Sequence, residues 1–86
     1  MPCVSRFYGI AVYFYPDDHN PPHFHGKYAG QDVMIEIETL DVIAGGLPTR
    51  AMRLLLEWAA LHRGELMANW ERMRAGQATM PMEPLV

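Results

Sequence analysis

Apolar and polar positions alternate along the first half of the chain. Residues 10–15 place isoleucine, valine and phenylalanine on one side and alanine and two tyrosines on the other. A period of two is typical of a β-strand, and a shorter strand is expected at residues 4–7. Residues 16–22 contain three prolines together with aspartate and asparagine. This composition predicts a loop, because proline supports neither a strand ladder nor a helix interior.

Residues 23–37 predict a β-hairpin. The alanine–glycine pair at 29–30 suits a two-residue turn, which places His23 opposite Glu36. The same register pairs a lysine with an aspartate, and such opposite charges contribute about 0.2–1 kcal/mol. A slip by one residue would mix the two faces, so the register is well specified. One face is apolar, and the other collects His23, His25, Lys27, Asp32, Met34 and Glu36.

Helical spacing replaces alternation after Pro48, a residue that suits the first turn of a helix. The apolar stripe that follows is wide enough to cover a sheet. Gly64 has low helix propensity and predicts a break, with a second helix over about residues 65–74; a single kinked helix is the alternative. With a further strand at 41–44, the order predicts an α+β fold. It comprises an antiparallel sheet of three to five strands, over about residues 4–44, with two C-terminal helices on one face.

The composition is that of a globular protein. Half of the 86 residues are hydrophobic, and the single cysteine excludes a disulfide scaffold. No apolar run approaches the roughly 18 residues of a membrane span, so we expect a cytoplasmic protein with no membrane partner. Residues 1–74 are predicted to form one domain, and residues 75–86 a flexible tail.

Charge is distributed unevenly. Residues 1–47 carry two basic and six acidic side chains, whereas residues 48–75 carry five basic and three acidic ones. The formal net charge is −3. A general nucleic-acid binder would present a broad basic surface, so the sequence indicates at most a local arginine patch.

The segment 17–25, Asp-Asp-His-Asn-Pro-Pro-His-Phe-His, is the candidate for chemistry. His23 and His25 are two positions apart on a predicted strand, so their rings share a face. Glu36 lies opposite His23, and the two tyrosines of the preceding strand also point away from its apolar side. Prolines limit the entropy lost on ordering the loop, which favours a preorganised site.

Three interpretations of this segment stay open. In the first, His23 and His25 hold a divalent metal, joined by His19 and by a carboxylate from Glu36 or the loop aspartates. In the second, a histidine acts as general acid or base without metal, and Glu36 orients its ring. In the third, the histidines are structural. The candidate catalytic residues are His19, His23, His25 and Glu36, and the candidate substrate-binding residues are Arg6, Tyr13, Tyr15, Asp18 and Asn20.

Several stretches together resemble a known family. They are residues 5–10, 18–25, 35–37, 47–48, 50–51, 56–58, 62–63 and 69–70. Over about residues 4–74 the chain resembles the small bacterial domain-of-unknown-function family 4160. The resemblance implies the toxin half of a type II toxin–antitoxin pair, with a small antitoxin encoded nearby as its partner. It carries over no catalytic role, only the motif positions Asp18, His19, Asn20, His23 and His25.

Two classes of function follow. One is a toxin acting on RNA, in which Tyr13 or Tyr15 stacks on bases and Arg6 or Arg53 holds a phosphate. The other is a non-catalytic module that uses the same face to hold a protein or a metal. In either case we expect His23 and His25 to be exposed to a ligand. Replacing either with alanine should then cost less than about 1–1.5 kcal/mol of stability.

Overall fold

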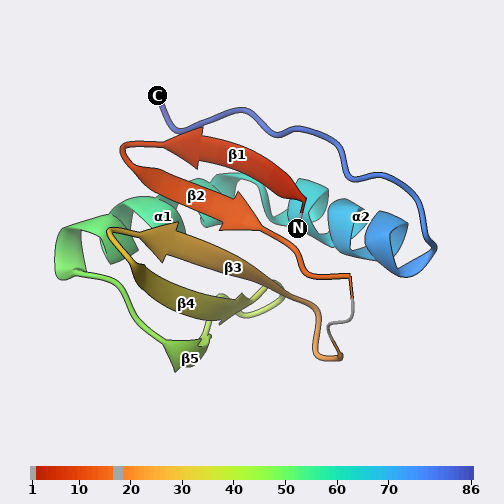
Figure 1. The fold of residues 1–86 in the computed structure, drawn as a ribbon, viewed down its shortest axis with the longest axis horizontal. Coiled ribbons are helices and arrows are strands. Elements are labelled where there is room, and N and C mark those ends of the chain that lie inside the picture. The colour runs from red at the N-terminus through yellow and green to blue at the C-terminus, as the bar shows by residue number, and fades with distance from the viewer. Residues whose placement is uncertain (1, 17–18) are drawn as a thin grey trace.

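The computed structural model describes residues 2–16 and 19–86. It contains five strands followed by two helices (Figure 1): β1 (Cys3–Phe7), β2 (Ile10–Tyr13), β3 (His23–Tyr28), β4 (Gln31–Glu36), β5 (Val42–Gly45), α1 (Thr49–Leu61) and α2 (Arg63–Arg74). The strands form one antiparallel sheet in chain order, and both helices lie on the same side of it. The predicted α+β fold is confirmed. No helix in these two ranges is long and apolar enough to cross a membrane.

The β3–β4 hairpin has the predicted register. His23 pairs with Glu36 and Lys27 pairs with Asp32. Ala29 and Gly30 both have positive φ, 49° and 81°, as a tight two-residue hairpin turn requires. The turn between β1 and β2 has the same φ values. Because consecutive strands are antiparallel, both hairpin turns lie at the same end of the sheet (Figure 1).

The two helices separate at His62, and not at Gly64 as the sequence predicted. His62 leaves helical geometry, with φ −124° and ψ 22°, whereas Gly64 lies inside α2. The His62 ring packs against Trp58, with ring centroids 5.2 Å apart, and its Nδ1 lies 2.7 Å from the carboxylate of Glu65. These side-chain contacts hold the junction at His62, and they outweigh the low helix propensity of a single glycine.

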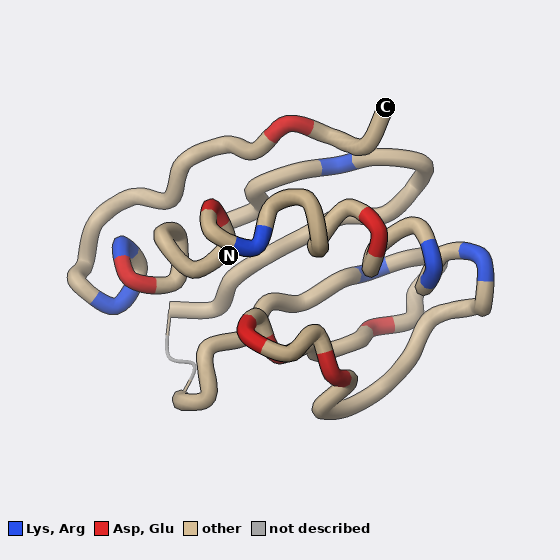
Figure 2. Tube along the Cα trace, turned by 180° about the vertical axis from the view of Figure 1, so that it is seen from behind, with Lys and Arg blue, Asp and Glu red and all other residues tan. Residues whose placement is uncertain are grey.

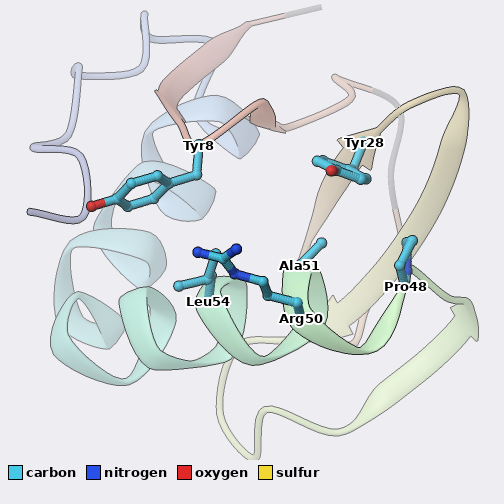
Figure 3. Close-up of a pocket in the computed structure, with 6 residues that line it drawn as sticks. All are labelled: Tyr8, Tyr28, Pro48, Arg50, Ala51 and Leu54. Carbon is cyan, nitrogen blue, oxygen red and sulfur yellow. The ribbon is translucent and has the colours of Figure 1, made fainter.

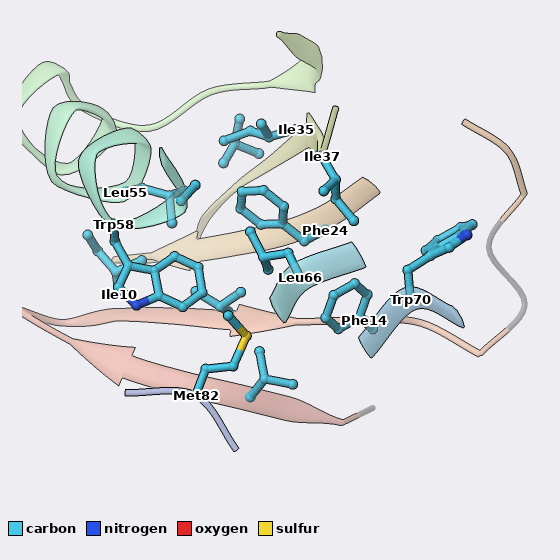
Figure 4. Close-up of a cluster of buried hydrophobic side chains, with 14 of the residues drawn as sticks. Ile10, Phe14, Phe24, Ile35, Ile37, Leu55, Trp58, Leu66, Trp70 and Met82 are labelled. Carbon is cyan, nitrogen blue, oxygen red and sulfur yellow. The ribbon is translucent and has the colours of Figure 1, made fainter. Parts of the chain in front are cut away.

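The core fills the space between the sheet and the helices (Figure 4). Trp58 is fully buried there and its ring lies against those of Phe7 and Phe24, with centroids 5.2 and 6.3 Å apart. Gly26 lets α1 approach the sheet closely, since a Cβ at this position would lie 2.6 Å from Cδ2 of Leu55. The helices therefore seal the apolar face of the sheet.

The C-terminal segment lies along the outer edge of β1 (Figure 1). The Met82 amide donates to the Val4 carbonyl at 2.7 Å, and the Met82 side chain is buried in the core. Trp58 Nε1 donates to the Glu83 carbonyl at 2.7 Å. The prediction of a flexible tail did not foresee these contacts, because its proline-rich, polar composition gives no sign that Met82 joins the core.

Candidate functional site

The loop before β3 positions the two motif histidines. The Ile37 amide donates to the Pro22 carbonyl at 3.0 Å. This bond joins the end of the loop to the residue that follows β4. His23 opens β3, and its Nδ1 lies 2.8 Å from the Pro21 carbonyl oxygen. Because a carbonyl can only accept, Nδ1 carries the hydrogen of this bond. This bond fixes the ring's tautomer and orientation when His23 is neutral.

Four contacts join five aromatic and imidazole rings into a continuous row, which we call the ring row. Tyr13 lies 6.3 Å from Tyr15, and Tyr15 lies 4.3 Å from His25, measured between ring centroids. His25 lies 5.1 Å from His23, which in turn lies 5.3 Å from Trp70 of α2. The Tyr15–His25 contact is edge-to-face, a favoured geometry for aromatic pairs. The two tyrosines and two histidines thus come together as the sequence predicted.

Burial separates the two histidines. His23 is only 5% exposed, so the expectation that its ring would meet a ligand is wrong. Trp70 packs on His23 where β3 begins, and the sequence placed Trp70 only on the apolar stripe of the second helix. His25 and Tyr15 are half-buried, which leaves His25 as the accessible imidazole of the pair.

Strand pairing sets two cations beside the ring row. Arg6 pairs with Ala11, which pairs with Lys27, so all three share the sheet face opposite the helices. We call this surface the His face. Arg6 and Lys27 are both exposed. Acidic residues also contribute, since Asp32 pairs with Lys27, and acidic positions gather around the β4–β5 connection (Figure 2).

The remaining predicted residues lie around this surface. Glu36 is half-buried opposite His23. His19 and Asn20 are exposed in the loop. Asp18, like Asp17, lies outside the described residues. The structure therefore does not test the loop aspartates as ligands or as substrate contacts.

The metal interpretation gains no third ligand from the structure. In residues 2–16 and 19–86, no group of three or more histidine, cysteine or acidic side chains could hold a metal ion. His23 and His25 are adjacent, but His23 Nδ1 already faces the Pro21 carbonyl. A metal held by this pair stays a prediction that needs a further ligand.

A small hollow lies beside His25. Its volume is about 130 Å³, and it is lined by His25, Asp32, Val33, Met34, Ala44 and Gly45. The sequence placed Met34 on the same face as His25 but gave no sign of the hollow, because it forms only when β5 pairs with β4. The hollow gives His25 an apolar neighbourhood on one side, with Asp32 as its single acidic lining residue.

The fold and this surface define a small α+β domain with a row of phenol and imidazole rings on its sheet. A family model described as "Domain of unknown function (DUF4160)" matches residues 9–71. The chain belongs to this family. Searches of curated proteins and of solved structures found no match.

Proposed function

We propose that this chain is the toxin component of a bacterial type II toxin–antitoxin pair and that it acts on RNA through the His face. The edge-to-face contact of Tyr15 and His25, at 4.3 Å between centroids, is the observation that carries the proposal. It sets a base-stacking ring and an accessible imidazole side by side on one surface.

The His face has the components that single-stranded RNA needs. Aromatic rings on a sheet stack with unpaired bases, each contributing about 1–3 kcal/mol. Tyr15 and His25 offer such rings, and Arg6 and Lys27 offer positive charge for phosphates on the same face. Because the chain's net charge is −3, stacking and not long-range attraction would supply most of the affinity.

His25 is the residue that we assign to proton transfer. Imidazole is the side chain used most often for general acid–base catalysis in enzymes. In RNA cleavage, His25 would take the proton of a ribose 2′-hydroxyl as that oxygen attacks the adjacent phosphorus. The bond to the 5′-oxygen then breaks, and the leaving oxygen takes a proton from water. His23, buried behind His25, is a positioning residue in this scheme.

A non-catalytic role of the same face is the second candidate. The hollow beside His25 is lined largely by apolar groups, among them Met34 and Ala44. Apolar hollows of this kind accept a side chain of a protein partner. In that role the antitoxin-like neighbour would dock on the His face, and His25 would contribute packing and a hydrogen bond.

Growth of bacteria that express the chain tests the proposal. We expect growth arrest, relief of arrest by the small protein encoded beside it, and fragmented RNA during arrest. His25→Ala should abolish both arrest and fragmentation, whereas His62→Gln, on the helical side, should abolish neither. Arrest without fragmentation would favour the binding role. If the chain causes no arrest at any expression level, the toxin proposal fails.

A further inference from the structure

A second cleft lies at the opposite end of the sheet from the His23 loop (Figure 3). Its volume is about 220 Å³, and its lining comprises Tyr8, Tyr28, Pro48, Arg50, Ala51 and Leu54. Tyr8 lies in the β1–β2 turn and Tyr28 ends β3, whereas the other lining residues come from the start of α1. Since β3 runs from His23 to Tyr28, this cleft and the ring row occupy opposite ends of the strand.

Two phenol rings form the strand side of the cleft. Tyr28 is half-buried and its ring lies over Gly9, where a Cβ would be 3.3 Å from Tyr28 Cε1. Gly9 also has a φ of 81°, so a larger residue there would be strained as well as crowded. Tyr8 is 56% exposed. The Tyr28 ring is therefore held by its packing on Gly9, whereas the Tyr8 ring is exposed at the mouth of the cleft.

Arg50 is the only charged residue in the lining. Among residues 2–16 and 19–86, no hydrogen bond or ion pair involves the Arg50 side chain. Figure 3 shows Arg50 extending along α1 toward Tyr8 and away from Tyr28, which lies at the other end of the cleft. A guanidinium can pair with a phosphate, and a phenol ring can stack on a flat ligand ring. The two together favour an anion that also carries an aromatic ring.

We propose that this cleft binds a nucleotide, with the base against Tyr8, the phosphate on Arg50, and Tyr28 closing the other end of the cleft. The volume is below the about 300–1,000 Å³ of typical ligand pockets, so it suits one base and its phosphate with the sugar at the mouth. Either a free nucleotide or the phosphorylated end of an RNA offers this chemistry. The site is independent of the His face, because Tyr28 lies on the other side of β3 from His25.

Calorimetric titration of the full chain with adenosine 5′-monophosphate tests the proposal. Tyr8→Asn removes the exposed ring and suits the positive φ of 49° at that turn, so the variant should fold. We expect Tyr8→Asn and Arg50→Gln each to weaken binding about tenfold or more. Arg63→Gln, an arginine outside the cleft, should leave the affinity unchanged.

Three further ligands separate the parts of the proposal. Adenosine without phosphate and ribose 5-phosphate without base should each bind at least about tenfold more weakly than the whole nucleotide. A 5′-phosphorylated trinucleotide that binds more tightly than the mononucleotide identifies an RNA end as the source; weaker binding identifies a free nucleotide. The proposal is overturned by no detectable nucleotide binding, by adenosine binding as tightly as the nucleotide, or by equal losses in Arg63→Gln and Arg50→Gln. Growth arrest is unaffected by these outcomes, so the toxin proposal stands or falls separately.

Discussion

Burial gives the two motif histidines different roles. His23 is enclosed by His25, Trp70 and the Pro21 carbonyl, whereas His25 borders a hollow and remains accessible. A buried ring with a fixed tautomer can orient a neighbour, and a half-exposed imidazole can meet a substrate. The pair therefore combines a buried ring with an accessible one.

This difference predicts unequal effects on stability. His23→Ala should lower the free energy of unfolding by about 1–3 kcal/mol, because it removes a buried ring and leaves the Pro21 carbonyl without its donor. His25→Ala should cost less than about 1 kcal/mol, since its ring is only half-buried. Chemical denaturation of both variants measures the difference. Equal losses would show that the burial of His23 does not matter to stability.

Two glycines provide a matched pair for the packing of α1 on the sheet. Gly26→Ala should destabilise by about 1–3 kcal/mol, because its Cβ would lie 2.6 Å from the fully buried Leu55 side chain. Gly64→Ala should stabilise by about 0.5–1 kcal/mol, since it lies in α2 with nothing within 4 Å of a Cβ. Thermal or urea denaturation compares them. An unchanged stability of Gly26→Ala would contradict the close approach of α1 to the sheet.

Sequence periodicity identified the face of each histidine but not its exposure. The face follows from the alternation of one strand, which is local information. The burial of His23 depends on Trp70, which lies 47 positions later in the chain and on another element. No pattern within β3 indicates the contact between His23 and Trp70. The sequence therefore could not show which of the two histidines is accessible.

At the scale of elements, the two edges of the sheet differ. The outer edge of β1 is paired with the C-terminal segment through the Met82 amide. β5 is the opposite edge, and Val42 and Ile43 on it are 48% and 43% exposed. A covered edge is protected from pairing with other chains, and β5 is protected only by its four-residue length and its irregular register with β4.

The anchoring of the C-terminal segment is testable at Asn69. Its buried side-chain amide donates to the Met80 carbonyl at 2.9 Å and accepts from the Met80 amide at 2.7 Å. Asn69→Ala should cost about 1–3 kcal/mol and accelerate hydrogen exchange at the Met80 and Met82 amides. Gln77→Ala, exposed in the same segment, serves as the control. Fast exchange of both amides in the unaltered protein would contradict this anchoring and support the predicted flexible tail.

The β3–β4 turn offers a stabilising change. Ala29 adopts a φ of 49°, a conformation that alanine disfavours and asparagine tolerates. Ala29→Asn should raise stability by about 0.5–1 kcal/mol, because Asn-Gly is the preferred pair for this turn. Gly30→Ala, with a φ of 81°, should lower it. A lower melting temperature for Ala29→Asn, or a higher one for Gly30→Ala, would contradict the turn geometry.

Local signals explain which elements the sequence predicted well. Turn chemistry and opposite charges are close together in the hairpin, so its register followed from residues 23–37 alone. The helix break depended on a contact between His62 and Trp58 and moved by two positions. The docking of Met82 on β1 links the two ends of the chain, and no local pattern reports it.

At the scale of the whole molecule, the sheet separates two surfaces with different chemistry. The His face carries the tyrosine and histidine rings of the ring row, and the cleft between the hairpin turns and α1 carries two tyrosines and Arg50. β3 contributes to both, from His25 on one side and Tyr28 on the other. A single substitution can therefore remove binding at one surface while ligand binding at the other surface is measured.

Chemical-shift mapping with a single-stranded RNA oligonucleotide tests most directly whether the His face binds RNA. The measurement uses the Arg50→Gln variant, in which the second cleft is weakened. We predict that the largest amide shifts fall on Tyr13, Tyr15, His25 and Lys27 and that they vanish in the double variant with His25→Ala. Shifts confined to the helices, or no shifts at all on these four residues, would contradict an RNA-acting His face.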